Sequence, residues 1–238
     1  MQDNENEDYS ATNELIEAVN SNLLETAIDL SQIDLKVAIL ALTKREYLLD
    51  DIPILKWIIS GGKILSNISK IHSIRKFYAF IMPIKDSGIF ENEDCKEKLE
   101  VICGSKKTLD FVIEQTLFSL DKYDAEIKAK WLAKMFVATF KEKKFSVDEY
   151  NAIQFSINSL NPITSISALE IYYQCRNNSR KKENYDNDLE LKRANADFSP
   201  LVLSGFLHLP KGGTFCDNPA GAFINDLGIR FYENIILA

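Results

Sequence analysis

The chain has 238 residues, of which 46% are hydrophobic and 26% charged, so it can bury a sizeable core. Its formal net charge of -7 argues against a protein that coats nucleic acid. Nine glycines and six prolines are few for this length, which disfavours an all-β fold built on tight turns. No apolar run reaches the ~18 residues of a membrane-spanning helix, and the acidic first residues lack the pattern of a secretory signal.

Apolar residues recur at helical spacing along most of the chain up to about residue 179, which predicts an array of helices. Thr12 is placed to cap the first helix, with Leu15 and Val19 on its buried stripe. An acid-rich connector is expected to hold a short helix at 94–102, and Ser105 and Asp124 are expected to begin the next two helices. Their predicted buried stripes are Leu109, Val112, Ile113, Leu117 and Leu120, and then Ile127, Trp131, Leu132, Met135, Phe136 and Phe140.

The clearest helix start is Ser146-Val147-Asp148-Glu149, which fits a capping box. The helix that follows is predicted to bury Tyr150, Ile153, Ile157 and Leu160. Asn161-Pro162 is expected to end it, and Ser165 or Ser167 to begin another.

The pattern changes after a charged stretch at 176–197, which is expected to be a linker or a surface helix. Ser199-Pro200 predicts a helix start, Gly212-Gly213 a turn between two short strands, and Asn225 the cap of a last helix. The order helix, strand, turn, strand, helix resembles the end of a winged-helix domain. We therefore expect a mainly α protein, a multi-helix array with a small C-terminal winged-helix-like α+β piece, divided into 1–84, 85–179 and 180–238.

One segment departs from the acidic balance of the chain, because no acidic residue lies between Asp51 and Asp86. Lys56, Lys63 and Lys70 recur there at intervals of seven, which places them on one stripe of a continuous helix unless Gly61-Gly62 bends it. A basic amphipathic helix of this kind can lie on an anionic membrane, with its apolar face among the acyl chains.

Two interpretations of this basic segment stay open. In the first, it engages an anionic membrane surface or a protein partner, and the binding residues are Lys56, Trp57, Lys63, Lys70, Arg75 and Lys76. In the second, it is a core helix whose cations face acidic residues of the same chain at 3–17 or 86–100.

Residues suited to catalysis or metal binding are sparse. His72 lies among cations with no carboxylate nearby in the sequence, and His208 lies beside a turn, so neither is expected to be catalytic. Cys95 and Cys103 fit no usual zinc spacing, and the run Gly104–Thr108 lacks the first glycine of a phosphate loop. We expect no metal and no cofactor, and we favour a non-enzymatic protein. A hydrolase or nuclease is a third interpretation, which requires distant acids to converge in a pocket.

The segment Leu49–Lys56, with the basic apolar stretch after it, resembles a pattern in uncharacterised helical proteins of bacteria and their prophages. The stretches 129–150 and 223–231 add to this resemblance, which covers about half of the chain and brings no catalytic residues. It implies a bacterial cytoplasmic protein and is consistent with a phage-defence or prophage locus.

The favoured function is that of a bacterial interaction or effector protein whose basic segment, 52–85, engages an anionic membrane surface or a protein partner. Such a protein would be cytoplasmic, with peripheral attachment to the inner membrane where lipid is the partner. The alternative is a nucleic-acid-binding regulator that uses the winged-helix-like piece. Asp217 in the turn region, and the absence of a concentrated Arg/Lys face on the helix that would read DNA, count against this alternative.

Overall fold

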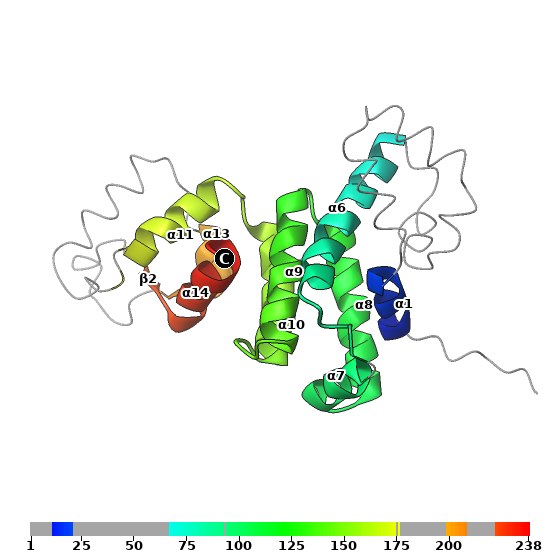
Figure 1. The fold of residues 1–238 in the computed structure, drawn as a ribbon. Helices are drawn as coiled ribbons and strands as arrows, with labels where there is room; N and C mark the ends of the chain where they lie inside the picture. Colours follow the sequence, from blue (N-terminus) through cyan, green and yellow to red (C-terminus); the bar gives the residue numbers. More distant parts are fainter. Residues whose placement is uncertain (1–10, 21–66, 93, 175, 177–198, 209–221) are drawn as a thin grey trace, which may run out of the picture. The chain divides into compact units, whose positions relative to one another are not determined.

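The computed structural model describes residues 11–20, 67–92, 94–174, 176, 199–208 and 222–238 (Figure 1). These residues are mainly helical, with one two-stranded sheet towards the end of the chain, so the predicted fold class is confirmed. The chain divides into two compact units, unit 1 at 1–143 and unit 2 at 144–238. This single division after Lys143 differs from the expected boundaries after 84 and 179.

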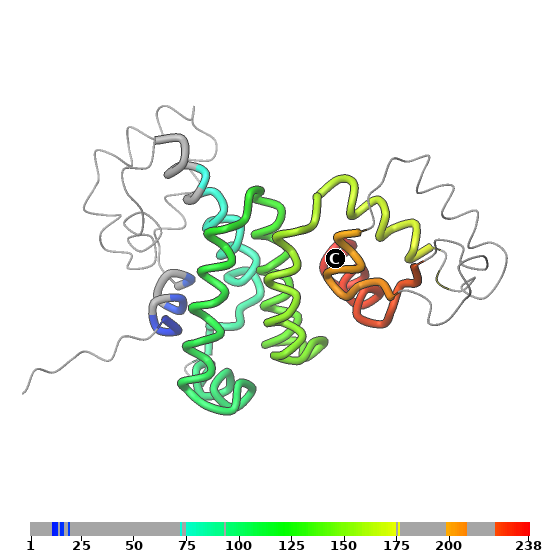
Figure 2. Tube along the Cα trace, turned by 180° about the vertical axis from the view of Figure 1, so that it is seen from behind, coloured from blue at the N-terminus to red at the C-terminus, as the bar shows by residue number. Residues whose placement is uncertain are grey.

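The described part of unit 1 consists of helices. These are α1 (Ala11–Asn20), α6 (Asn67–Asp86), α7 (Cys95–Cys103), α8 (Lys106–Lys122) and α9 (Glu126–Phe140). The longest, α6, packs along α9, while α1 lies against α8 and α6, and α7 packs on α8 (Figures 1 and 2). None of the described helices is both long enough and apolar enough to span a bilayer.

Apolar side chains at helical spacing form the core of unit 1. All five residues of the predicted α8 stripe are buried, and in α9 only Ile127, which is 40% exposed, departs from the prediction. Phe136 sits at the centre, with its ring centroid 6.4 Å from that of Phe80, 6.2 Å from that of Phe90 and 4.6 Å from that of Phe140. Burying each such ring contributes roughly 1.5–3 kcal/mol, so these contacts fix α6 on α9.

The helix ends follow the predicted caps at some positions and depart from them at others. Ser105 caps α8 as predicted, because its side chain accepts a hydrogen bond from the backbone N–H of Thr108. Thr12 does not cap α1, which begins at Ala11; its hydroxyl donates to Asp110 of α8 at 2.6 Å. Asp124 does not cap α9 either, because the cap position is Ala125. Thr12 therefore contacts another helix of the unit, while Asp124 pairs with Lys128 one turn into α9.

The described part of unit 2 combines helices with the two strands. Its elements are α10 (Val147–Ser159), α11 (Thr164–Gln174), α13 (Ser199–Leu203), β1 (Leu207–His208), β2 (Phe223–Ile224), α14 (Asp226–Phe231) and the π-helix η2 (Tyr232–Ile236). The strands are antiparallel, with Leu207 opposite Ile224 and His208 opposite Phe223. The expected order of helix, strand, strand and helix is confirmed, while the expected glycine turn lies outside the described residues.

Local caps position the helices of unit 2. The capping box at Ser146 and Glu149 is confirmed in both directions, and the four predicted core residues of α10 are buried. The next helix starts earlier than expected, at Thr164, because the side chain of Asn161 accepts hydrogen bonds from the N–H groups of Ile163 and Thr164.

A close backbone contact joins α14 to the chain before β1. Asn225 caps α14 as predicted, and its side-chain amide also donates to the carbonyl of Gly205 at 2.6 Å. A Cβ at Gly228 would collide with the carbonyl oxygen of Phe206, so only glycine allows α14 to approach this closely. The rings of Phe206 and Phe231 stack behind this contact at 4.4 Å.

The guanidinium of Arg230 joins α14 to the start of α10. It bonds the carboxylate of Glu149 and donates to the carbonyl of Lys144 at 2.8 Å. The hydrogen bond from Arg230 is the main reason why the pKa of Glu149 lies below its ordinary value of 4.5. The carboxylate of Glu149 therefore has two roles: it accepts the backbone N–H of Ser146 in the capping box, and it forms the ion pair with Arg230.

We expect acid to weaken unit 2 through Glu149. Because the folded state lowers the pKa of Glu149, its stabilisation is present at neutral pH and is lost as the pH falls from 4.5 through the folded pKa. Arg230→Gln should cost up to about 1 kcal/mol at neutral pH and should flatten this acid dependence. Urea unfolding of the full chain, followed by circular dichroism across this pH range, measures both effects.

Arg176→Gln is the matched control, since Arg176 lies over the ring of Tyr173 in the same unit. It should keep the wild-type acid dependence. An unchanged acid dependence in Arg230→Gln would contradict the assignment.

Candidate functional site

The predicted binding residues of the basic segment fall into two groups in the structure. Lys56, Trp57 and Lys63 lie outside the described residues, and Lys70 lies in α6 with its side chain outside the description. Arg75 and Lys76 are described, and both point to groups at the junction between α8 and α9.

Lys76 is buried, with only 4% of its surface exposed, so it is not the exposed binding residue that we expected. Its ammonium group donates to the carbonyls of Asp121 and Tyr123 at 2.7 and 2.8 Å. These carbonyls end α8, where the helix dipole favours a positive charge. Burial lowers the pKa of Lys76, and the nearby charges of Asp121 and Asp124 partly oppose that shift.

Two further side chains on the same face of α6 reach the same junction. Arg75 lies 3.8 Å from a carboxylate oxygen of Glu126, and both side chains are about half exposed. The Nε2 atom of His72 lies 3.2 Å from the carbonyl of Asp124. The Asp124 carboxylate pairs with Lys128 at 2.8 Å, and that hydrogen bond is the main cause of its lowered pKa.

This junction of residues 121–126 therefore supplies internal partners for Arg75 and Lys76 of the basic segment. The core interpretation placed those partners at 3–17 or 86–100. The partners of Arg75 and Lys76 lie instead between α8 and α9, a region that the sequence marks only as a helix boundary.

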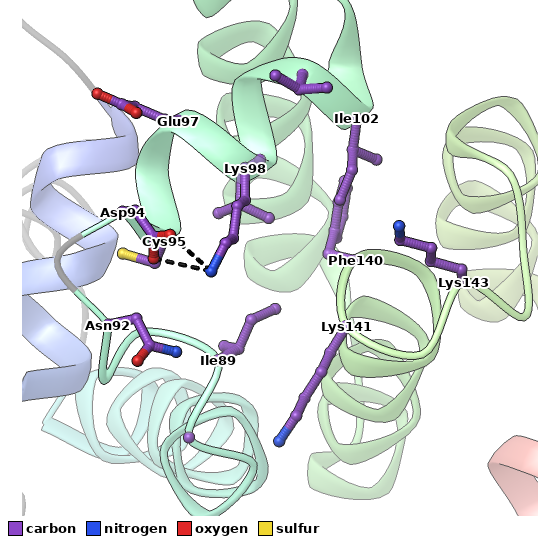
Figure 3. A pocket seen from close by; sticks show the side chains of 13 residues that line it. Ile89, Asn92, Asp94, Cys95, Glu97, Lys98, Ile102, Phe140, Lys141 and Lys143 are labelled. Carbon is purple, nitrogen blue, oxygen red and sulfur yellow. Dashed lines mark hydrogen bonds and ion pairs between the residues drawn. The ribbon is translucent and has the colours of Figure 1, made fainter.

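A separate hollow of about 530 Å³ opens in unit 1 beside α7 (Figure 3). Its walls come from α7, from the loop that precedes α7 and from the end of α9. Ile89, Ile102 and Phe140 give it an apolar surface. Three lysines and two carboxylates complete the charged lining: Lys98, Lys141, Lys143, Asp94 and Glu97.

The three lysines of the hollow differ in how they are partnered. Lys98 pairs with Asp94 at 2.7 Å, and Lys141 donates to the carbonyl of Ser87. Lys143 makes no hydrogen bond or ion pair within the described residues, and its ammonium group lies across the hollow from that of Lys98 in Figure 3. Glu97 points away from the hollow in the same view.

The backbone of Lys143 adds a second unusual feature. Its φ of 57° lies in the left-handed region, and among the described residues it is the one non-glycine with a positive φ. This conformation costs an L-residue roughly 1–2 kcal/mol. Sequence analysis missed Lys98 and Lys143, because nothing in their spacing marks them as neighbours.

The positions of the other cysteine, histidine and glycine residues considered for chemistry are explained by the fold. Burial raises the pKa of the Cys103 thiol to about 11, so it stays protonated at neutral pH. Gly104, with φ at 85°, ends α7, and Ser105 starts α8, which accounts for the run that faintly matches a phosphate loop. His208 lies in β1, exposed, with its ring 5.6 Å from that of Phe223. Within the described ranges, no cluster of three metal-ligating side chains occurs.

Comparison with known proteins finds no match: no family model, no curated protein and no solved structure corresponds to this chain.

Replacing Lys76 tests the anchor of α6. Lys76→Met should lower the free energy of unfolding by about 1–3 kcal/mol, because two carbonyls at the end of α8 lose their buried donor. Arg75→Gln, one residue away, should cost less than about 0.5 kcal/mol, since the Arg75 pair is exposed. Urea unfolding followed by circular dichroism gives both values, and equal stabilities for Lys76→Met and the wild type would refute the anchor.

Replacing Lys143 tests its backbone strain. Lys143→Gly should raise the free energy of unfolding by about 0.5–1 kcal/mol, because glycine adopts a positive φ without the steric cost and loses only part of that gain to its freedom in the unfolded chain. Lys143→Ala removes the same side chain but keeps the Cβ, so it should not stabilise. A Lys143→Gly protein less stable than Lys143→Ala would show that no strain is stored there.

Proposed function

We propose that this protein is a non-enzymatic interaction protein that engages an anionic membrane surface through residues 52–70. The observation that carries the proposal is the division of the acid-free segment 52–85. Two of its later cations, Arg75 and Lys76, meet the junction at 121–126 inside unit 1. The cations that the proposal assigns to the membrane are Lys56, Lys63 and Lys70.

The burial of the second half of α6 supports the assignment of Lys56, Lys63 and Lys70 to the membrane. Phe77, Phe80, Ile81 and Ile84 are buried in unit 1, so the second half of α6 is committed to the core. The chain that precedes it carries lysines at intervals of seven among Ile, Leu and Trp residues. A helix with that pattern suits the boundary between acyl chains and anionic headgroups.

The magnitudes fit reversible binding. Each lysine near an anionic surface contributes about 1 kcal/mol, and these contributions weaken within a Debye length of about 8 Å at physiological salt. Trp57 adds an aromatic side chain of the type that prefers the headgroup region. The proposed binding is therefore sensitive to salt and to lipid charge.

Vesicle flotation tests the proposal with charge reversals. The wild-type chain should float with phosphatidylglycerol-containing vesicles at low salt and not with phosphatidylcholine alone. Lys63→Glu combined with Lys70→Glu should reduce binding about a thousandfold, because each reversal removes an attraction of about 1 kcal/mol and adds a repulsion of about the same size. No flotation of the wild type at low salt would overturn the proposal.

Lys107→Glu combined with Lys130→Glu is the matched control, since both lysines are exposed on α8 and α9 and the charge change is the same. This control should float like the wild type. Trp131→Phe leaves Trp57 as the only tryptophan, and its emission should shift to shorter wavelengths on anionic vesicles. Equal loss of flotation in both double variants would mean that net charge alone drives binding, which would also contradict the proposal.

The winged-helix-like arrangement of unit 2 supports one alternative, a nucleic-acid-binding regulator. The described helix before β1, α13, carries no Lys or Arg, and Arg230 of α14 is paired with Glu149, so this arrangement offers DNA few described cations. Binding to duplex DNA with a steep salt dependence would favour the regulator over the membrane protein. The link to bacterial and prophage proteins stays a prediction.

A further inference from the structure

We propose that the hollow beside α7 binds a small monoanionic amphiphile, a molecule with one negatively charged head and an unbranched apolar chain. The head would lie between the ammonium groups of Lys98 and Lys143, and the chain against Ile89, Ile102 and Phe140. The proposal uses no residue of 52–70, so it is independent of the proposed membrane function.

The size and lining of the hollow suit such a ligand. Its volume of about 530 Å³ falls within the usual range of small-molecule sites, roughly 300–1,000 Å³. Those sites combine apolar walls with a few polar groups that fix orientation. Here the apolar residues come from the loop before α7, from α7 and from α9, so the chain of a ligand would contact three separate segments.

The charges of the hollow favour one negative charge on the ligand. Of the charged side chains that line it, Glu97 points away and Lys98 pairs with Asp94, which leaves a positive surplus. Lys98 is already held by Asp94, whereas Lys143 has no ion-pair or hydrogen-bond partner within the described residues. Lysine acts as a point charge without the fork of arginine, which suits a single anionic head rather than bidentate recognition.

The left-handed backbone conformation of Lys143 independently supports a ligand-binding role for its side chain. Glycine would occupy a φ of 57° at lower cost, yet the chain places here a lysine whose side chain makes no described hydrogen bond or ion pair. Residues held in such conformations cluster at ligand sites, where the side chain has a task. A ligand head beside the ammonium of Lys143 supplies that task.

Decanoate is the probe, used below the concentration at which it forms micelles and measured by isothermal titration calorimetry with the full chain. It should bind saturably at one site. Acetate keeps the head without the chain and decanol keeps the chain without the charge, so each should bind at least about tenfold more weakly. Equal binding of decanol and decanoate, or binding of decanoate without saturation, would overturn the proposal.

Variants at Lys143 separate a ligand role from a structural role. Lys143→Gly should weaken decanoate binding about tenfold while the protein becomes more stable, so a loss of folding cannot explain the result. Lys143→Arg should keep most of the affinity because it keeps the charge. Lys130→Gln, on α9 about 15 Å from Phe140 along the helix axis, should bind like the wild type. Unchanged affinity in Lys143→Gly would refute the site.

Two sources of the same chemistry can be told apart. If the natural ligand is a single-chain phospholipid, lysophosphatidylglycerol should bind the full chain and Lys143→Gly should weaken that binding; if it is a free carboxylate, lysophosphatidylglycerol should not bind, while decanoate does. The variant carrying Lys63→Glu and Lys70→Glu should retain decanoate binding in either case. Failure of the membrane proposal and failure of this one therefore give different results.

Discussion

The buried ammonium group of Lys76 is the contact on which the arrangement of α6 depends. A lysine is rarely buried to this degree, because its charge loses hydration and needs compensating acceptors. The two carbonyls at the end of α8 provide them, and their orientation adds the favourable end of a helix dipole. One side chain thus satisfies a helix end and fixes where α6 crosses the junction between α8 and α9.

The apolar contacts around this anchor explain why it can be buried. Phe80 of α6 packs edge-on against Phe136 of α9, and Phe90 and Phe140 extend the same cluster. Phe80 lies one helical turn after Lys76 on α6, and the burial of Lys76 lowers its pKa. Aromatic packing and the buried charge therefore support one another, and α6 belongs to the core of unit 1 from Lys76 onward.

The described part of unit 1 gives partners to some of its cations and leaves Lys143 without one. Arg75 and Lys76 of the acid-free segment have partners at the junction of residues 121–126. In the hollow beside α7, Lys98 and Lys141 have partners, whereas Lys143 has none among the described residues. In the hollow, a cation without a described partner, rather than a catalytic group, is the distinguishing feature.

The sequence by itself determined the local structure: the stripes of α8, α9 and α10, the caps at Ser105, Ser146 and Asn225, and the strand pair before α14. These features depend on residues within about four positions of one another, so spacing is enough to predict them. Only the tertiary structure decided that Lys76 of α6 donates to the carbonyls at the end of α8. The same holds for the hydrogen bond from Thr12 to Asp110, and for the hollow that Lys98 and Lys143 share. Those pairs are distant in the chain, and the packing of α6 on α9 and of α7 on α8, which no local pattern encodes, sets their distances.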